Sequence, residues 1–148
     1  MKHEVDFIVV GGIAAALHGA PLSTFDVDVV HSREPGNVRR LLPALGDLQA
    51  FYRTQPEKRL KPRESHLLSR GHQLLMTRHG PLDLLGTIGR GLGYDELLEH
   101  TTEMQVAGKV AVLVLNLEKL IEIMEELAND KDRAVLPLLR RVLEKKRG

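Results

Sequence analysis

The sequence predicts an α+β protein, because strand patterns and helix patterns both recur along its 148 residues. Apolar and polar residues alternate over 25–30, which is typical of a strand. Apolar runs at 73–76 and 82–85, separated by a turn with Gly and Pro, indicate a hairpin. The C-terminal part has the period of amphipathic helices. We therefore expect a core of residues 1–115 and a helical segment, 116–148, that packs on it.

Turn and cap residues set the limits of the expected elements. Gly11 and Gly12 end the first strand, and Asn116 is a good N-cap for the helix that follows it. Pro137 indicates either a kink in the last helix or a boundary between two helices. We expect strands at 5–10, 25–30, 73–76 and 82–85, one or two strands within 106–115, and helices at 13–18, 37–45, 94–100, 117–128 and 131–145. The polar segment 53–69 is predicted to be a loop or excursion.

Composition excludes several classes of protein. The formal net charge is +1, so the chain as a whole shows no preference for nucleic acid or membrane. It has no cysteine, which excludes disulfides and thiolate metal sites and is typical of a cytoplasmic protein. No apolar run is long enough to span a membrane, and the N-terminus does not have a signal-peptide pattern. With no Trp and few other aromatic residues, stacking platforms for single-stranded nucleic acid are not expected.

A pair of carboxylates is the strongest functional signal in the sequence. Asp26 and Asp28 are two residues apart on a predicted strand, so their side chains point to the same side. Two ionised carboxylates at this spacing repel each other unless one is protonated or a cation neutralises both. Oxygen ligands of this kind suit Mg²⁺, which also takes substrate phosphates. Taken alone, an Asp-x-Asp pattern is more often only a solvated strand face.

The Gly11-Gly12 pair and Asp83 extend this pattern. A Gly-Gly turn lets the backbone approach a ligand closely, and the N–H groups that begin the next helix favour a phosphate. Asp83 lies in an apolar context, where a lone charge is costly without a partner. A third carboxylate would complete a two-metal site and help to deprotonate an attacking hydroxyl. A lone Gly-Gly is otherwise an ordinary turn.

These segments together resemble the polymerase-beta-like nucleotidyltransferase superfamily. The resemblance rests on Val10-Gly11-Gly12, Phe25-Asp26-Val27-Asp28-Val29 and Leu82-Asp83-Leu84, and also covers Ala14-Ala15-Ala16-Leu17-His18-Gly19, His79-Gly80-Pro81, Leu117-Glu118-Lys119-Leu120-Ile121 and Lys131-Asp132. The chain is most similar to small stand-alone bacterial members, some of which are toxins of toxin–antitoxin or abortive-infection systems. The resemblance implies a mixed sheet flanked by helices. It also implies that Asp26 and Asp28 bind Mg²⁺ or Mn²⁺ and that Asp83 completes the site.

Further residues are candidates for binding the nucleotide. Thr24 precedes the Asp pair and can hydrogen-bond a phosphate, or only its own turn. Lys131 stands at the start of the last helix, where it is either a phosphate ligand or part of a solvated face. The chain departs from the family pattern at two places. Leu22-Ser23 stand where a basic residue is frequent, and Met124 stands where a Lys is frequent. His18 is expected at a helix end and His79 in an exposed turn.

Three hypotheses follow. The first is a metal-dependent nucleotidyltransferase that moves a nucleoside monophosphate from an NTP to a hydroxyl of RNA, a protein or a small molecule. The second, motivated by the missing basic residues, is a catalytically degenerate nucleotide-binding or protein-interaction module that self-associates or binds a partner. The third is a toxin held inactive by a cognate antitoxin. None of the three requires a membrane.

Overall fold

The computed structural model describes residues 3–22, 26–106, 108, 110–127 and 130–147, except for a few side chains near the C-terminus. Within these residues, seven strands form one mixed sheet in the order β3-β4-β5-β2-β1-β7-β6. The strands are β1 (Phe7–Val10), β2 (Val27–His31), β3 (Phe51–Tyr52), β4 (His72–Thr77), β5 (Gly80–Leu85), β6 (Thr101–Val106) and β7 (Val110–Leu115). The predicted α+β class is therefore confirmed.

Strand pairing brings together segments that are far apart in the sequence. β1 is antiparallel to β2 and parallel to β7, while β2 is parallel to β5. β4 and β5 form the antiparallel hairpin that the sequence predicted, and β6 and β7 form a second one. The centre of the sheet thus consists of β5, β2, β1 and β7. Asp83 lies on β5, Asp28 lies on β2, and β1 leads into the Gly-Gly pair.

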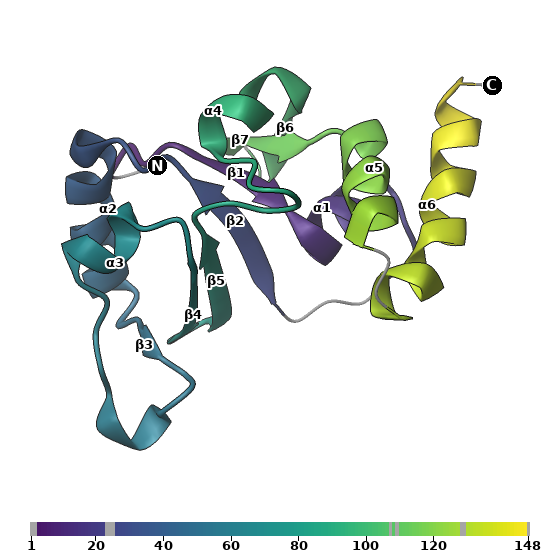
Figure 1. Cartoon of the computed structure of the whole chain (residues 1–148). Coiled ribbons are helices and arrows are strands. Elements are labelled where there is room, and N and C mark those ends of the chain that lie inside the picture. Colours follow the sequence, from purple (N-terminus) through teal and green to yellow (C-terminus); the bar gives the residue numbers. More distant parts are fainter. Residues whose placement is uncertain (1–2, 23–25, 107, 109, 128–129, 148) are drawn as a thin grey trace.

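Helices cover the sheet at its two ends (Figure 1). The helices are α1 (Gly11–Leu17), α2 (Pro35–Asp47), α3 (Glu64–Leu68), α4 (Tyr94–Leu97), α5 (Leu117–Leu127) and α6 (Asp130–Arg147), with 3₁₀ turns η1 (Pro56–Lys58) and η2 (Leu98–His100). α2 packs with α3 near the β3 edge, whereas α5 packs with α6 and against α1. In the described part of the chain, no helix has the length and apolar character needed to cross a membrane.

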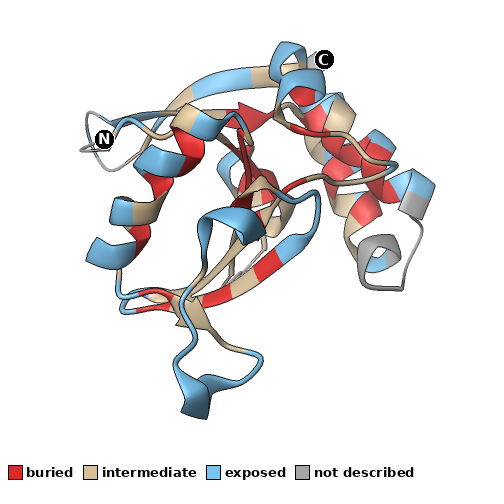
Figure 2. Cartoon of the chain, turned by 60° about the vertical axis from the view of Figure 1, so that its left-hand side comes forward, coloured by how far each residue is buried: buried red, intermediate tan, exposed pale blue. Residues whose placement is uncertain are grey.

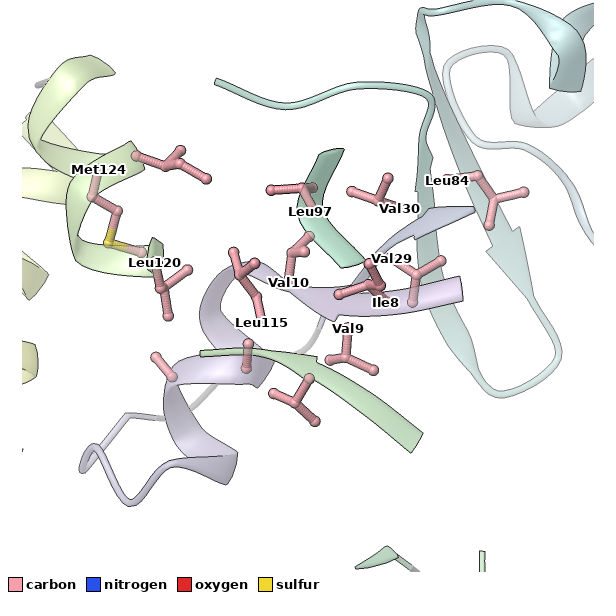
Figure 3. Close-up of a cluster of buried hydrophobic side chains, with 14 of the residues drawn as sticks. Ile8, Val9, Val10, Val29, Val30, Leu84, Leu97, Leu115, Leu120 and Met124 are labelled. Carbon is pink, nitrogen blue, oxygen red and sulfur yellow. The ribbon is translucent and has the colours of Figure 1, made fainter. Parts of the chain in front are cut away.

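The core lies between the central strands and these helices. Ile8, Val30, Leu84 and Leu115 are fully or almost fully buried, as expected for strands covered on both faces. Figure 3 shows Leu97 of α4 and Leu120 and Met124 of α5 in one cluster with apolar side chains of the central strands, and Figure 2 shows that the buried positions follow the central strands and the inner faces of the helices. The segment between β3 and α3 projects from this core and is almost entirely exposed.

Several predicted limits were wrong in detail. Gly11 and Gly12 belong to α1 rather than preceding it, and Asp26 lies just before β2, which starts at Val27. The 53–69 excursion contains η1 and α3. Leu67 of α3 is fully buried, and α3 packs against α2. α6 continues through Pro137, so this residue does not separate two helices.

Candidate active site

Asp28 and Asp83 lie side by side at the centre of the sheet. β2 and β5 are parallel neighbours, and Asp28 and Asp83 are Cα partners in their register. Directly paired residues of adjacent strands project to the same face of a sheet. The carboxylates of two segments that are 55 positions apart in the sequence (83 − 28) are therefore brought onto one face.

Gly11 closes this site from the side of β1. Val10, the last residue of β1, is the Cα partner of Asp28, so α1 starts directly beside that carboxylate. Gly11 has a φ of +69°, and a Cβ added to it would stand 2.5 Å from Asp28 Oδ2. Only glycine meets both conditions without strain or displacement of Asp28. Gly11 thus borders the carboxylate of Asp28.

Arg53 provides a cation at the same place. It follows β3 at the root of the exposed excursion, and its Nη1 donates to Asp83 Oδ1 at 2.5 Å and to the carbonyl oxygen of Leu75 at 2.9 Å. The ion pair is partly buried, with 26% of the Arg53 side chain and 13% of the Asp83 side chain exposed. Salt and solvent screen the attraction between partly buried charges less than the attraction between charges at the surface.

The negative charges of all three predicted aspartates act on Arg53, although only Asp83 is in contact with it. Its pKa is raised, first by the hydrogen bond to Asp83 and then by the negative charges of Asp83, Asp26 and Asp28, against an opposing effect of burial. Asp26 lies just before β2 and is half-buried. The structure therefore brings all three predicted aspartates within the electrostatic reach of one guanidinium.

The donor set suits a hard divalent cation. Carboxylate oxygens are preferred ligands of Mg²⁺ and Mn²⁺, and no Cβ at residue 11 stands against Asp28 Oδ2. Among the described residues, no three His, Asp or Glu side chains are already grouped as ligands of one metal ion. Asp83 Oδ1 is instead engaged by Arg53.

A mainly apolar cavity of about 350 Å³ opens beside Asp28 and Gly11. Its walls come from β1, β5, the segment after β5, and the inner face of α5, which contributes Leu120, Ile123 and Met124. Larger cavities, of about 510 and about 520 Å³, lie elsewhere and contain none of the three aspartates. Of these three cavities of the described residues, the smaller one adjoins the Asp28 carboxylate, so it is the one that belongs to the candidate site.

The other predicted residues have different outcomes. Thr24 lies outside the described residues, and Lys131 is in α6 but its side chain is outside what the structure describes. His18 is buried, where its Nε2 donates to Leu115 O at 2.8 Å and its Nδ1 accepts from Lys146 Nζ at 2.9 Å. His79 is exposed in the β4–β5 turn, as expected. Lys119 Nζ bonds to Glu122 at 3.1 Å.

Arg53 is the residue that sequence reasoning missed. The sequence shows only that it begins a segment rich in Arg and Lys, and no spacing links it to Asp83, 30 residues later. Its position follows from the pairing of β3 with β4 and of β4 with β5. These strand pairings, and not a local sequence pattern, therefore set Arg53 beside Asp83.

Comparison with known proteins supports the fold. No protein-family model matches the chain, and no curated protein matches its sequence. The structure is similar to the crystal structure of TM1012 from Thermotoga maritima, a protein provisionally described as a nucleotidyltransferase, with a TM-score of 0.56 and 15% sequence identity. The match covers 96% of this chain and 84% of that one. The chain therefore has a nucleotidyltransferase-like fold, in which a mixed seven-stranded sheet of the described residues is flanked by helices.

Proposed function

We propose that this protein is a metal-dependent nucleotidyltransferase that transfers a nucleoside monophosphate from an NTP to a hydroxyl group. The observation that carries the proposal is the pairing of Asp28 with Asp83 in the β2–β5 register, directly beside Gly11. Two carboxylates on one face can bind a divalent cation, and the helix N-terminus next to them can bind a phosphate. The fold shared with TM1012 agrees with this function.

The reaction is a displacement at the α-phosphorus. The acceptor oxygen forms a bond to this phosphorus, while the bond to the oxygen that bridges the α- and β-phosphates breaks. Pyrophosphate leaves with that bonding electron pair, and the hydroxyl proton passes to the Asp83 carboxylate. The acceptor is a hydroxyl of RNA, a protein or a small molecule.

Each of the three aspartates has a proposed role. Asp26 and Asp28 would hold the divalent cations, and Asp83 would also bind metal and orient the attacking hydroxyl. Bound Mg²⁺ or Mn²⁺ would supply Lewis-acid stabilisation of the charge that develops on the phosphates. The register of β2 and β5 fixes Asp28 and Asp83 before the substrate arrives, so little reorganisation is needed at the moment of reaction.

The start of α1 and the cavity beside it receive the nucleotide. Gly11 and Gly12 are the first two residues of α1, whose N-cap Val10 provides no side-chain cap. Because the first N–H groups of a helix have no helical acceptor, they are donors for a phosphate. The apolar cavity next to Gly11 is placed for the base, and Thr24 and Lys131 are proposed to add phosphate contacts from the segments before β2 and at the start of α6.

The test is transfer of label from α-³²P-NTPs to total cellular RNA, protein or small molecules in the presence of Mg²⁺ or Mn²⁺. Wild type is expected to label an acceptor, and the Asp26→Ala, Asp28→Ala double variant is expected not to. Asp95→Ala removes an exposed aspartate of α4 and serves as the matched control. Equal labelling by wild type and double variant would contradict an enzymatic role.

The competing hypothesis of a degenerate module remains testable in the same protein. Met124 lines the candidate cavity in place of a basic residue, which favours that hypothesis. It predicts weak or absent Mg²⁺-dependent NTP binding, together with self-association or a stable partner. Calorimetry with each NTP separates the two hypotheses, because tight Mg²⁺-dependent binding contradicts the degenerate module.

The proposal includes a toxin role controlled by a cognate antitoxin. If the transferase modifies an essential acceptor, expression of wild type should arrest growth, and the Asp26→Ala, Asp28→Ala variant should not. Harmless high-level expression of an active enzyme would exclude this role while leaving the transferase activity intact.

A further inference from the structure

Arg53 joins the exposed excursion to the carboxylate site. Its backbone N–H donates to Leu74 O at 3.1 Å, and the preceding Tyr52 N–H donates to Leu60 O at 2.8 Å, so the backbone around Arg53 is fixed at the root of the excursion. Beyond the root, the 55–61 segment is exposed (Figure 2). The guanidinium points back to Asp83, away from the solvent that surrounds this segment.

The guanidinium reaches the site through one of its nitrogens. Nη1 makes both hydrogen bonds, to Asp83 Oδ1 and to Leu75 O, and a guanidinium has five N–H donors in a planar fork. This fork matches the geometry of phosphate oxygens as well as that of a carboxylate. Arg53 is thus in a position to exchange one anionic partner for another with a small movement of its side chain.

Charge decides which partner it takes. Without a divalent cation, Arg53 is a positive charge in contact with Asp83 and near two further aspartates. Because Nη1 contacts Asp83 Oδ1, a divalent cation held by the same carboxylate would repel the guanidinium. An NTP brings several negative charges to the same place, where they attract a guanidinium.

We propose that Arg53 alternates between two partners: it neutralises Asp83 in the free protein, and it binds the NTP phosphates once a divalent cation occupies Asp83. This inference rests on the proposed function, because it assumes a metal at the three aspartates. Arg53 thereby supplies the phosphate-binding cation from the edge of the sheet. The exchange also makes metal binding and nucleotide binding cooperative, since the metal releases the group that grips the nucleotide.

The proposal predicts opposite effects of one substitution. Arg53→Gln removes the competing charge, so Mn²⁺ alone, titrated as MnCl₂ by calorimetry, should bind about ten-fold more tightly than to wild type. The same variant should bind non-hydrolysable α,β-methylene NTPs at saturating Mg²⁺ about ten-fold more weakly, because a charge-assisted contact to phosphate is lost. Arg53→Lys keeps the charge without the fork and should fall between wild type and Arg53→Gln in both titrations.

Lys58→Gln is the matched control, since it removes one positive charge from the exposed excursion without touching Asp83. It should change neither affinity. A merely structural Arg53 would weaken both affinities, and an Arg53 without a role would change neither; either result overturns the proposal while wild-type metal binding still supports the aspartate site. Failure of wild type to bind Mn²⁺ would overturn both the proposal and the metal-dependent function.

Arginine signals of wild type give a second measurement that needs no variant. Guanidinium resonances recorded by ¹⁵N NMR should show the Arg53 Nη groups in restricted rotation in the metal-free protein, because Asp83 and Leu75 hold Nη1. Mg²⁺ should release this restriction, and Mg²⁺ with an α,β-methylene NTP should restore it. An Arg53 signal that is the same in all three states would contradict the exchange of partners.

Discussion

Gly11 lies so close to Asp28 that a single methyl group at residue 11 would displace the carboxylate. A Cβ there would be 2.5 Å from Asp28 Oδ2 and 3.2 Å from Asp28 Cβ, at a φ of +69°. Gly11→Ala is expected to destabilise the fold by about 2 kcal/mol, because strain at positive φ adds to the clash. It should also abolish the rise in melting temperature on adding Mn²⁺.

Gly19→Ala is the control for the effect of strain alone. Gly19 has a φ of +103°, and an added Cβ would have no atom within 4 Å. This variant should lose stability, but its Mn²⁺ response should match that of wild type. If Gly11→Ala responds to Mn²⁺ as wild type does, the close approach to Asp28 has no role in metal binding.

Metal binding to the aspartates should appear as thermal stabilisation. A ligand that binds only the folded arrangement raises the free energy of unfolding by RT ln(1 + [L]/Kd), so millimolar Mg²⁺ or Mn²⁺ should raise the melting temperature of wild type. Asp28→Asn keeps the size of the side chain but removes its charge, and should lose most of this rise. Asp95→Asn, at an exposed position of α4, should keep it. If millimolar Mn²⁺ leaves the melting temperature of wild type unchanged, these carboxylates form no metal site.

The Arg53–Asp83 ion pair should contribute measurably to stability. Because both side chains are partly buried, removal of either charge leaves the other poorly solvated, at a cost of about 1–3 kcal/mol. In a double-mutant cycle of Arg53→Gln and Asp83→Asn, measured by urea unfolding, we expect a coupling energy of about 1 kcal/mol. If the effects of the two substitutions on the free energy of unfolding simply add, the contact is not formed in solution.

His18 should make stability depend on pH. Burial lowers the pKa of His18; the hydrogen bond to Leu115 partly raises it, and the positive charge of Lys146 lowers it further. A lowered pKa means that the unfolded chain binds the proton more readily than the folded one. The contribution of neutral His18 to stability is therefore full above the unfolded value of about 6.5 and declines as pH falls towards the lower folded value.

Urea unfolding between pH 7.5 and pH 4.5 measures this dependence. His18→Gln retains a donor for Leu115 O but cannot be protonated, so stability should fall less with decreasing pH than in wild type. Lys146→Ala removes the adjacent charge and should also reduce the slope, whereas Lys145→Ala should not. His31, whose pKa burial also lowers, supplies a remaining slope in all these variants. An unchanged slope in His18→Gln would contradict the buried, neutral state of His18.

Asn116 caps the helix that lines the candidate cavity. Its Oδ1 accepts from the Lys119 backbone N–H at 2.9 Å, as expected of an N-cap residue. Asn116→Ala should lower the free energy of unfolding by about 1 kcal/mol in a urea titration. Asn116→Ser retains an oxygen that can accept the same bond and should remain within a few tenths of a kcal/mol of wild type. Equal losses in the two variants would show that the cap contributes little.

Local chemistry made much of the fold predictable. Glycine and asparagine at the ends of elements, the two-residue period around Asp28 and the apolar face of 117–128 act over a few residues. The sequence alone therefore indicated most of the strands and helices and the hairpin, but not β3 or α3. The same periodicity predicted Asp26 and Asp28 on one side of a strand, although in the structure Asp26 lies just before β2. The sequence also indicated Asp83, because a charge in an apolar run needs a partner.

Tertiary structure decided which partners these residues meet. That Asp83 stands beside Asp28 depends on the parallel pairing of β2 with β5, and that Gly11 borders the same carboxylate depends on the antiparallel pairing of β1 with β2. Arg53 reaches Asp83 only because β3 and β5 both pair with β4. Pairings between distant strands arise from the burial of whole sheet faces, which no short segment encodes, whereas turns, caps and periods are properties of neighbouring residues.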